Sequence, residues 1–236
     1  MSRAYGVETK MKVLAICSGG LDSVSFLGKY IGKDMEVMTF NYGQKANTET
    51  ERLREICKFL NLPLKIIDIT FMVKLWKGTQ LTDDTVKVEN EYTPSVVVPL
   101  RNGVMLMIGM AYAYSIKADK IIYGSHTGDI GTFDHNGHTE FYYPDCSPIF
   151  ANSLTEAGKA GTFLCDKKVE LESPAMLGIG KLDLVKLGYE KLGFLLFRTW
   201  SCYKSGNKQC GKCESCINRK NAFKNAKVED KTEYDN

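Results

Sequence analysis

Short apolar runs alternate with longer helical patterns along the chain up to residue 192. The apolar runs have the length of buried strands and lie at residues 11–17, 36–40, 64–69, 120–123 and 168–171. The helical patterns lie between or after them, at residues 24–30, 47–60, 104–117, 147–161 and 181–192. This alternation predicts an α/β fold, with an open parallel sheet covered by helices on both faces.

The remaining stretches carry weaker patterns. Residues 71–98 contain charges and a Thr-Pro step, and residues 128–143 are rich in Gly, His and Asp, so we expect both to be loops. Residues 227–236 are expected to fray. We predict a main domain at residues 1–198 and a smaller cysteine-bearing unit at residues 199–236.

A Gly-rich turn follows the first predicted strand directly. Residues 18–23 read Ser-Gly-Gly-Leu-Asp-Ser and lead into a helix. Glycines allow close approach of a ligand to the backbone, and the amide groups and dipole of a helix N-terminus attract anions. The order strand, turn, helix therefore predicts a phosphate cradle. Asp22 cannot attract phosphate, but it could cap the helix or help to hold Mg²⁺.

Overall composition narrows the class of protein. The chain has 236 residues, of which 44% are hydrophobic and 25% charged, with a net charge of +3. These values are ordinary for a globular protein and do not favour a dedicated nucleic-acid binder. The sequence shows no membrane span and no signal peptide, which predicts a cytoplasmic protein.

The cysteines divide into scattered and clustered positions. The clustered ones are Cys202, Cys210, Cys213 and Cys216. Four thiolates at this spacing favour a closed tetrahedral zinc site without a catalytic position, with an iron–sulfur cluster as the rival. Arg219 and Lys220 lie close by in sequence and leave a nucleic-acid role for this segment open.

The turn at residues 18–23 resembles the pyrophosphate loop of the ATP pyrophosphatases, which cleave ATP between its α and β phosphates. Further stretches extend the likeness: Val-Pro-Leu-Arg-Asn at 98–102, Tyr-Pro-Asp-Cys at 143–146, and Thr-Trp-Ser-Cys-Tyr at 199–203, which leads into the cysteine cluster. Together they resemble the QueC family, the 7-cyano-7-deazaguanine synthases, from about residue 12 to residue 223. The ending at residues 229–234 looks closer to archaeal members.

The resemblance implies a HUP-like, ATP pyrophosphatase-type fold and an ATP-dependent ligase. In that family 7-carboxy-7-deazaguanine and ammonia give the 7-nitrile through adenylated intermediates, on the way to queuosine and archaeosine. It further implies ATP, Mg²⁺ and a structural Zn²⁺, a homodimer, and no direct binding of nucleic acid. A carboxylate is a poor electrophile, and adenylation supplies a leaving group while the enzyme positions reactants and stabilises phosphate charge.

Residue roles follow from matching positions in the family. ATP binding is assigned to Cys17, Ser18, Gly19, Gly20, Leu21, Asp22, Ser23, Tyr42, Gln44 and Arg101. The catalytic set is Asp22, Arg101 and Lys181, in which Arg101 meets phosphate or the substrate carboxylate and Lys181 stabilises the leaving pyrophosphate. Tyr143 and Asp145 are assigned to the substrate, with Asp145 accepting from the N–H edge of the base. His126 and Asp129 join this set because they lie near the predicted crevice, where they could take part in proton transfer, although a hydrogen-bonded structural pair is the favoured interpretation. Cys146 is expected to line the pocket rather than to act as a nucleophile.

The chain also departs from the family pattern. Ala46 stands where the family has a histidine, Leu100 stands where it has a glycine, and residues 131–140 lengthen a loop that contains His135 and His138. These changes leave one alternative open, a paralogue that uses the same adenylation on a protein or tRNA acceptor. A noncatalytic, zinc-dependent regulator of nucleic acid is the rival from another class.

Overall fold

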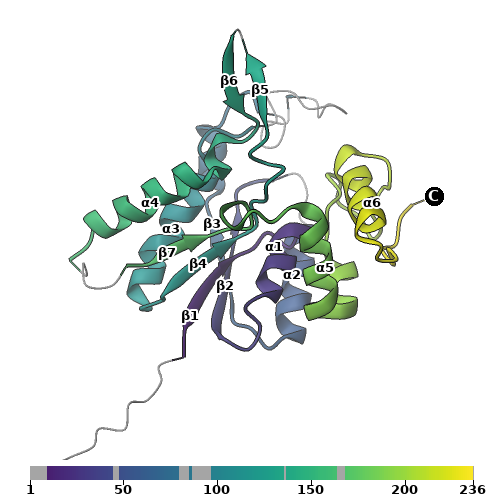
Figure 1. Cartoon of the computed structure of the whole chain (residues 1–236), viewed down its shortest axis with the longest axis horizontal. Coiled ribbons are helices and arrows are strands. Elements are labelled where there is room, and N and C mark those ends of the chain that lie inside the picture. The colour runs from purple at the N-terminus through teal and green to yellow at the C-terminus, as the bar shows by residue number, and fades with distance from the viewer. Residues whose placement is uncertain are drawn as a thin grey trace, which may run out of the picture.

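The computed structural model describes residues 10–44, 48–79, 85–86, 97–135, 137–163 and 168–235. Its centre is a five-stranded parallel sheet in the order β3-β2-β1-β4-β7 (Figure 1). The strands are β1 (Lys12–Ile16), β2 (Asp34–Asn41), β3 (Leu64–Asp68), β4 (Lys120–Tyr123) and β7 (Glu170–Glu172). The predicted parallel sheet is therefore confirmed.

Helices cover both faces of this sheet, as the alternating pattern predicted. One face carries α1 (Leu21–Gly28), α2 (Thr48–Phe59) and α5 (Lys181–Leu192), and the other carries α3 (Arg101–Ser115) and α4 (Pro148–Ala160). Successive β1 side chains point to opposite faces: Val13 and Ala15 pack in the core beneath α1, whereas Leu14 packs in the core beneath α3. Both faces are buried, so the strand reads as one continuous apolar run.

The strand order reverses next to β1, and this reversal positions the site. The chain goes from β1 outward to β2 and β3, then returns to place β4 on the other side of β1. Loops after β1 and β4 therefore diverge to opposite faces and leave a crevice at the carboxyl ends of these strands. The Gly-rich turn follows β1 at this point.

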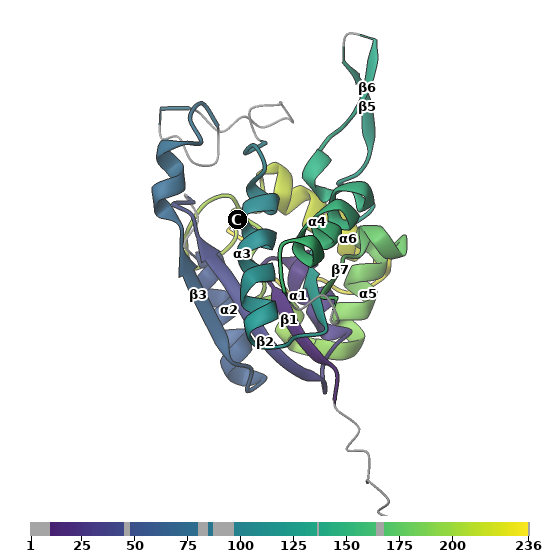
Figure 2. The ribbon, with the colours of Figure 1, turned by 90° about the vertical axis from the view of Figure 1, so that its left-hand side faces the viewer.

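Two segments predicted to be loops have regular structure. Within residues 128–143, the strands β5 (Thr132–His135) and β6 (His138–Phe141) pair as an antiparallel hairpin that projects from the body (Figures 1 and 2). Phe133 stacks on Tyr142 at its base. Within residues 71–98, a 3₁₀ turn, η1, spans Thr70–Lys74, while residues 80–84 and 87–96 lie outside the described residues. The sequence patterns missed these short elements because both segments are rich in Gly or in charged residues.

The cysteine-bearing segment packs on the main body through the helix α6 (Glu214–Ala226), which the sequence patterns missed. Its Ala222, Phe223 and Ala226 join a buried cluster with Leu21 and Val185. The prediction that residues 227–236 fray is wrong for the described part. The Gln209 amide donates to the Glu233 carbonyl, and the Asp235 amide donates to the Gln209 carbonyl. These two bonds pair Gln209 with Tyr234 in an isolated β-bridge beside the cysteines.

No helix in the described parts of the chain is long and apolar enough to cross a membrane. Short 3₁₀ helices η3 (Pro144–Cys146), η4 (Ala175–Leu177) and η5 (Gly193–Arg198) connect the larger elements.

Candidate nucleotide site and metal centre

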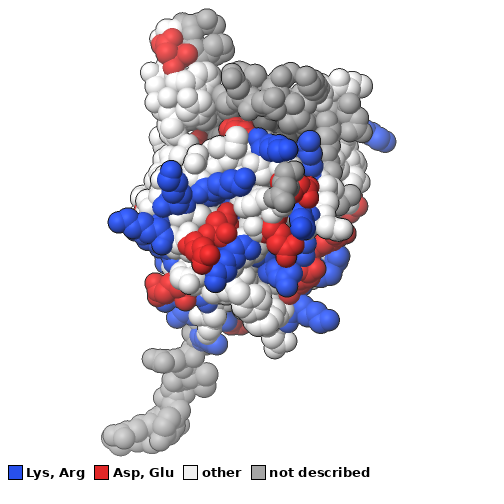
Figure 3. All heavy atoms as spheres, turned by 90° about the vertical axis from the view of Figure 1, so that its right-hand side faces the viewer, with Lys and Arg blue, Asp and Glu red and all other residues white. Residues whose placement is uncertain are grey.

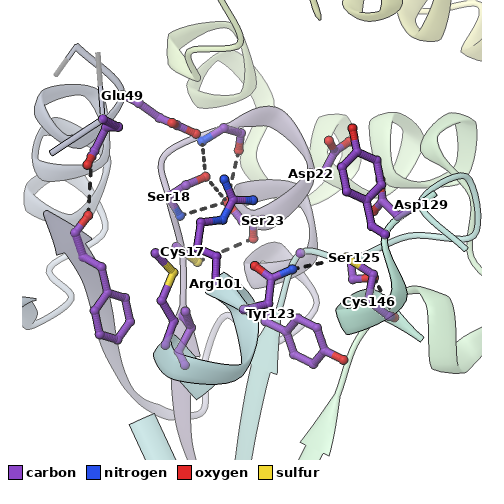
Figure 4. A pocket seen from close by; sticks show the side chains of 18 of the residues that line it. Cys17, Ser18, Asp22, Ser23, Glu49, Arg101, Tyr123, Ser125, Asp129 and Cys146 are labelled. Carbon is purple, nitrogen blue, oxygen red and sulfur yellow. Dashed lines mark hydrogen bonds between the residues drawn. The ribbon is translucent and has the colours of Figure 1, made fainter. Parts of the chain in front are cut away.

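The Gly-rich turn folds as a tight loop between β1 and α1 (Figure 4). Gly19 has a φ of +106°, which strains any L side chain. The Ser18 and Ser23 hydroxyl oxygens lie 3.3 Å apart, and the Gly20 amide donates to Ser18 Oγ at 3.1 Å. The N-cap residue of α1 is Gly20, which has no side chain that could cap the helix. The loop thus presents hydroxyl and amide groups at a positive helix end, which is the chemistry of an anion site.

The loop opens into a cavity of about 430 Å³. Its walls include most residues that the sequence assigned to ATP or substrate: Cys17, Ser18, Gly20, Leu21, Asp22, Ser23, Tyr42, Gln44, Arg101, Asp129, Tyr143, Asp145 and Lys181. Gly19 belongs to the loop but does not line the cavity, and His126 is buried just behind it. Ala46 lies outside the described residues.

Asp22 is the centre of a charged cluster on one side of the cavity. Lys181 Nζ lies 3.1 Å from Asp22 Oδ2, and His126 Nε2 lies 3.9 Å from the same oxygen. The Gly128 amide donates to His126 Nδ1 at 3.0 Å, and Asp129 Oδ2 lies 3.5 Å from the same nitrogen. This cluster unites the start of α1, the start of α5 and the turn after β4.

Two carboxylates in this cluster are poorly compensated. Asp22 Oδ1 is buried and has no hydrogen-bond partner among the residues that the structure describes. Burial raises the pKa of Asp129, although the neighbouring His126 opposes that shift. A buried carboxylate oxygen without a donor fits a cation that arrives with phosphate groups, because Mg²⁺ needs only one or two protein carboxylates in such sites.

Arg101 stands on the opposite side of the cavity, as the first residue of α3. Its guanidinium lies 5.6 Å from the centre of the Tyr42 ring. Burial alone would lower the pKa of Arg101, but the neighbouring Tyr42 and Asp145 hold it above the usual value. A fixed planar cation therefore faces the loop across the cavity, in reach of an anionic ligand.

Asp145 already has partners in the structure. It is 8% exposed and accepts from the Asn102 amide at 2.9 Å and from Asn102 Nδ2 at 3.2 Å. Burial nevertheless raises its pKa. Asp145 therefore anchors the first turn of α3 as well as lining the cavity; its contact with a base stays a prediction.

The thiols that line the cavity are unsuited to nucleophilic attack. Burial raises the pKa of Cys146 to about 12 and raises that of Cys17 even further. A thiol in this state carries almost no thiolate at neutral pH. This agrees with the expectation that Cys146 only lines the pocket.

Several wall residues were missed by sequence reasoning. They are Thr39, Glu49, Val98, Asn102, Met105, Trp200, Ser201, Tyr203 and Ser215, among others. Glu49 was hidden because it sits in the first turn of an ordinary amphipathic helix. The Trp-Ser-Cys-Tyr stretch was noticed only as a prelude to the cysteines, whereas it also forms a wall of the cavity.

Trp200 joins this wall to the phosphate loop. Its backbone amide donates to the Gly19 carbonyl at 3.0 Å, and its indole Nε1 donates to the Cys202 carbonyl at 3.0 Å. One residue thus links the loop directly to the first cysteine of the cluster.

The four clustered cysteines come together as a candidate metal centre. Their Sγ atoms all lie within 4.8 Å of one another, with Cys210 and Cys216 at 3.9 Å and Cys202 and Cys213 at 4.0 Å. Thiolates bound tetrahedrally to a single zinc at 2.3 Å would be about 3.8 Å apart. The Cys213 amide donates to Cys210 Sγ at 3.3 Å, and such bonds stabilise ligating thiolates. The Sγ separations therefore fit four thiolates around one zinc ion. They fit an iron–sulfur cluster less well, because several iron atoms would separate its ligating thiolates.

Arg219 does not belong to a nucleic-acid surface. It is 0% exposed and donates to Thr199 Oγ1 at 2.8 Å, Ser201 Oγ at 3.1 Å and Thr232 Oγ1 at 3.0 Å. Its proximity to Lys220 in sequence was misleading, because a helix sends neighbouring residues to different faces. The molecular face in Figure 3 intersperses basic and acidic groups rather than gathering basic ones.

Comparison with known proteins identifies relatives over nearly the whole chain. The profile of the family described as "Queuosine biosynthesis protein QueC" matches residues 12–227. The 7-cyano-7-deazaguanine synthase of Hahella chejuensis is 36% identical over 230 residues, covering 95% of this chain and 93% of that protein. That of Caldicellulosiruptor bescii is 39% identical over 232 residues, covering 95% of this chain and 98% of that protein.

Solved structures show only a distant likeness. A 4-thiouridine synthetase, in an RNA complex with bound ATP, matches with a TM-score of 0.47 and 15% identity, over 92% of this chain and 50% of that one.

Proposed function

Because the chain belongs to the QueC family of queuosine biosynthesis proteins, we propose that it converts 7-carboxy-7-deazaguanine and ammonia to 7-cyano-7-deazaguanine at the expense of ATP. The observation that carries the proposal is the loop of residues 18–23 at the reversal of the strand order, in one cavity with Lys181 beside Asp22 and with Arg101. The names of the relatives supply the substrate.

The reaction divides into two activations of the same carbon. The substrate carboxylate attacks the α-phosphate of ATP, which forms an acyl adenylate and releases pyrophosphate. Ammonia then displaces AMP to give the amide. The amide oxygen attacks the α-phosphate of a second ATP and releases a second pyrophosphate, and loss of AMP together with the two amide protons leaves the nitrile.

The residues of the site suit phosphate transfer more than covalent catalysis. In this proposal the loop and Lys181 hold the pyrophosphate, while Arg101 neutralises charge on the α-phosphate or on the substrate carboxylate. Asp22 Oδ1 would be a ligand of Mg²⁺, and the bound ion would neutralise phosphate charge. We assign the deazapurine to the part of the cavity lined by Tyr143, Asp145 and Asp129, with His126 buried beside it.

The cysteine centre has a structural part in this proposal. Four thiolates leave zinc no open position, so the metal would hold the wall that contains Trp200 rather than activate a ligand. We further propose a cytoplasmic homodimer that acts on free bases and feeds queuosine and archaeosine formation, without direct contact to nucleic acid. We also propose that residues 199–236 form the smaller, zinc-binding unit.

The decisive experiment is mass spectrometry of a reaction that contains 7-carboxy-7-deazaguanine, ammonium, Mg²⁺ and ATP. Nitrile, pyrophosphate and AMP are the expected products. ATP cleavage without nitrile, or product that stops at the amide, would contradict the proposal. That result would favour the paralogue that uses the same adenylation on a protein or tRNA acceptor.

A further inference from the structure

Glu49 brings a carboxylate to the phosphate loop from the first turn of α2 (Figure 4). The contact is very close. A Cβ atom on Gly20 would lie 2.7 Å from Glu49 Oε1, and one on Gly19 would lie 2.1 Å from the Glu49 carbonyl oxygen. Gly19 is therefore required by α2, because the clash would be with backbone, whereas at Gly20 it would be with the end of the flexible Glu49 side chain.

The groups that surround this carboxylate are the ones a phosphate would use. Hydrogen bonds from the Ser18 side chain and the Gly20 backbone favour its charged form, as does the Arg101 guanidinium from α3. Asp22 of α1 opposes the charge, and burial raises the pKa of Glu49. An acidic group thus lies inside a site built to attract anions, although it repels them.

We propose that Glu49 is a placeholder anion, which satisfies the donors of the loop in the empty enzyme and is displaced when a phosphate group of the nucleotide takes its position. The inference rests on the proposed nucleotide site. It gives the Ser18 hydroxyl and the Arg101 guanidinium a negatively charged partner when no nucleotide is bound. It also gives the enzyme a competitor for pyrophosphate, which favours release of that product.

The competing role for an acidic residue at this position is that of a magnesium ligand. The two roles have opposite effects on the affinity for phosphate. A placeholder weakens the binding of phosphate, with or without metal, since it must be pushed aside and remains a like charge nearby. A metal ligand strengthens binding, and only when Mg²⁺ is present.

The test is calorimetric titration of the full-length protein with inorganic pyrophosphate, with and without Mg²⁺. We expect Glu49→Gln to bind metal-free pyrophosphate about tenfold more tightly than the parent, because one like charge is removed from the site. Glu49→Ser, which is too short to reach the loop, should also bind more tightly. Glu51→Gln is the matched control, because Glu51 lies exposed on the same helix and should leave the affinity unchanged.

Each other outcome is informative. Unchanged or weaker pyrophosphate binding by both Glu49 variants would overturn the placeholder role. Weaker binding that is seen only when Mg²⁺ is present would assign Glu49 to the metal. If pyrophosphate binds to none of the proteins, parent included, the assignment of the loop under the proposed function fails and the inference fails with it.

Discussion

In the cysteine-bearing segment, buried polar groups have partners that match them. Arg219 donates to three hydroxyl groups and to the Leu196 carbonyl. In the cavity at the phosphate loop, Asp22 Oδ1 is buried without a donor from the described part of the chain, and burial raises the pKa of Glu49, Asp129 and Asp145. One region is arranged for stability, while the other holds unfavourable charge that a ligand could relieve.

A strained backbone residue also borders the cavity. Leu100 directly precedes Arg101 at the cavity and has a φ of 52°, a left-handed conformation that is costly for leucine. The family glycine that this leucine replaces would adopt it without strain. The difference between the regions teaches that binding groups are held in place by their surroundings, at some cost to stability.

The largest effect should come from the cysteine segment. Cys213→Ser removes one of four thiolates, so we expect loss of bound metal and destabilisation by about 5 kcal/mol or more. Metal content by mass spectrometry and the melting temperature measure both effects. Lys208→Ala, an exposed change in the same segment, should alter neither; unchanged metal content in the serine variant would refute the metal centre.

Asp22→Asn tests whether the cavity, unlike the cysteine-bearing segment, is arranged for activity rather than stability. Because its carboxylate is under-satisfied in the free protein, we expect nitrile formation to fall by about 10²–10³-fold with no loss of melting temperature. Turnover and thermal denaturation should be measured on the same preparation. Activity close to that of the parent would remove Asp22 from the catalytic set.

Arg219→Met should destabilise the segment by about 3 kcal/mol, since several buried acceptors lose their donor. Lys220→Met is the control, because the Lys220 side chain is exposed and its change should cost far less. Equal melting temperatures for the two variants would show that the buried arginine is not the anchor.

Asp129→Asn should make the protein more stable at pH 8. The pKa of Asp129 is raised in the folded state, so the stabilisation from its protonated form is present below the unfolded pKa of about 3.9 and is lost as pH rises through the folded pKa. We therefore expect a gain of about 1 kcal/mol at pH 8 that disappears near pH 4. Melting curves across this range check it; a gain that is independent of pH would point to packing instead.

The smallest effect concerns the strained turn before α3. Leu100→Gly should stabilise the protein by about 0.5–1 kcal/mol, because glycine adopts a positive φ without penalty. Leu75→Gly is a matched control, since Leu75 is also exposed but has a φ of −97°. It should lose stability in the same denaturation assay, and equal shifts in both variants would contradict the strain.

The sequence determined the features that depend on neighbours along the chain. Apolar runs located the strands of the sheet and the amphipathic helices, and residues 18–23 and the cysteine spacing located two sites. These signals are local, because a strand, a Gly-rich turn or a set of closely spaced thiols is defined within a few residues. Family likeness then added Arg101, Lys181 and Asp145, which no local pattern connects to the loop.

The tertiary structure decided which distant residues share a cavity and which polar groups are compensated there. Glu49 and Trp200 carry no mark of a site in the sequence, yet α2 and the segment before the cysteines bring both against the loop. Arg219 was equally ambiguous until burial showed it to be structural. The physical reason is that burial and charge compensation arise between residues far apart in sequence, and only packing sets those distances.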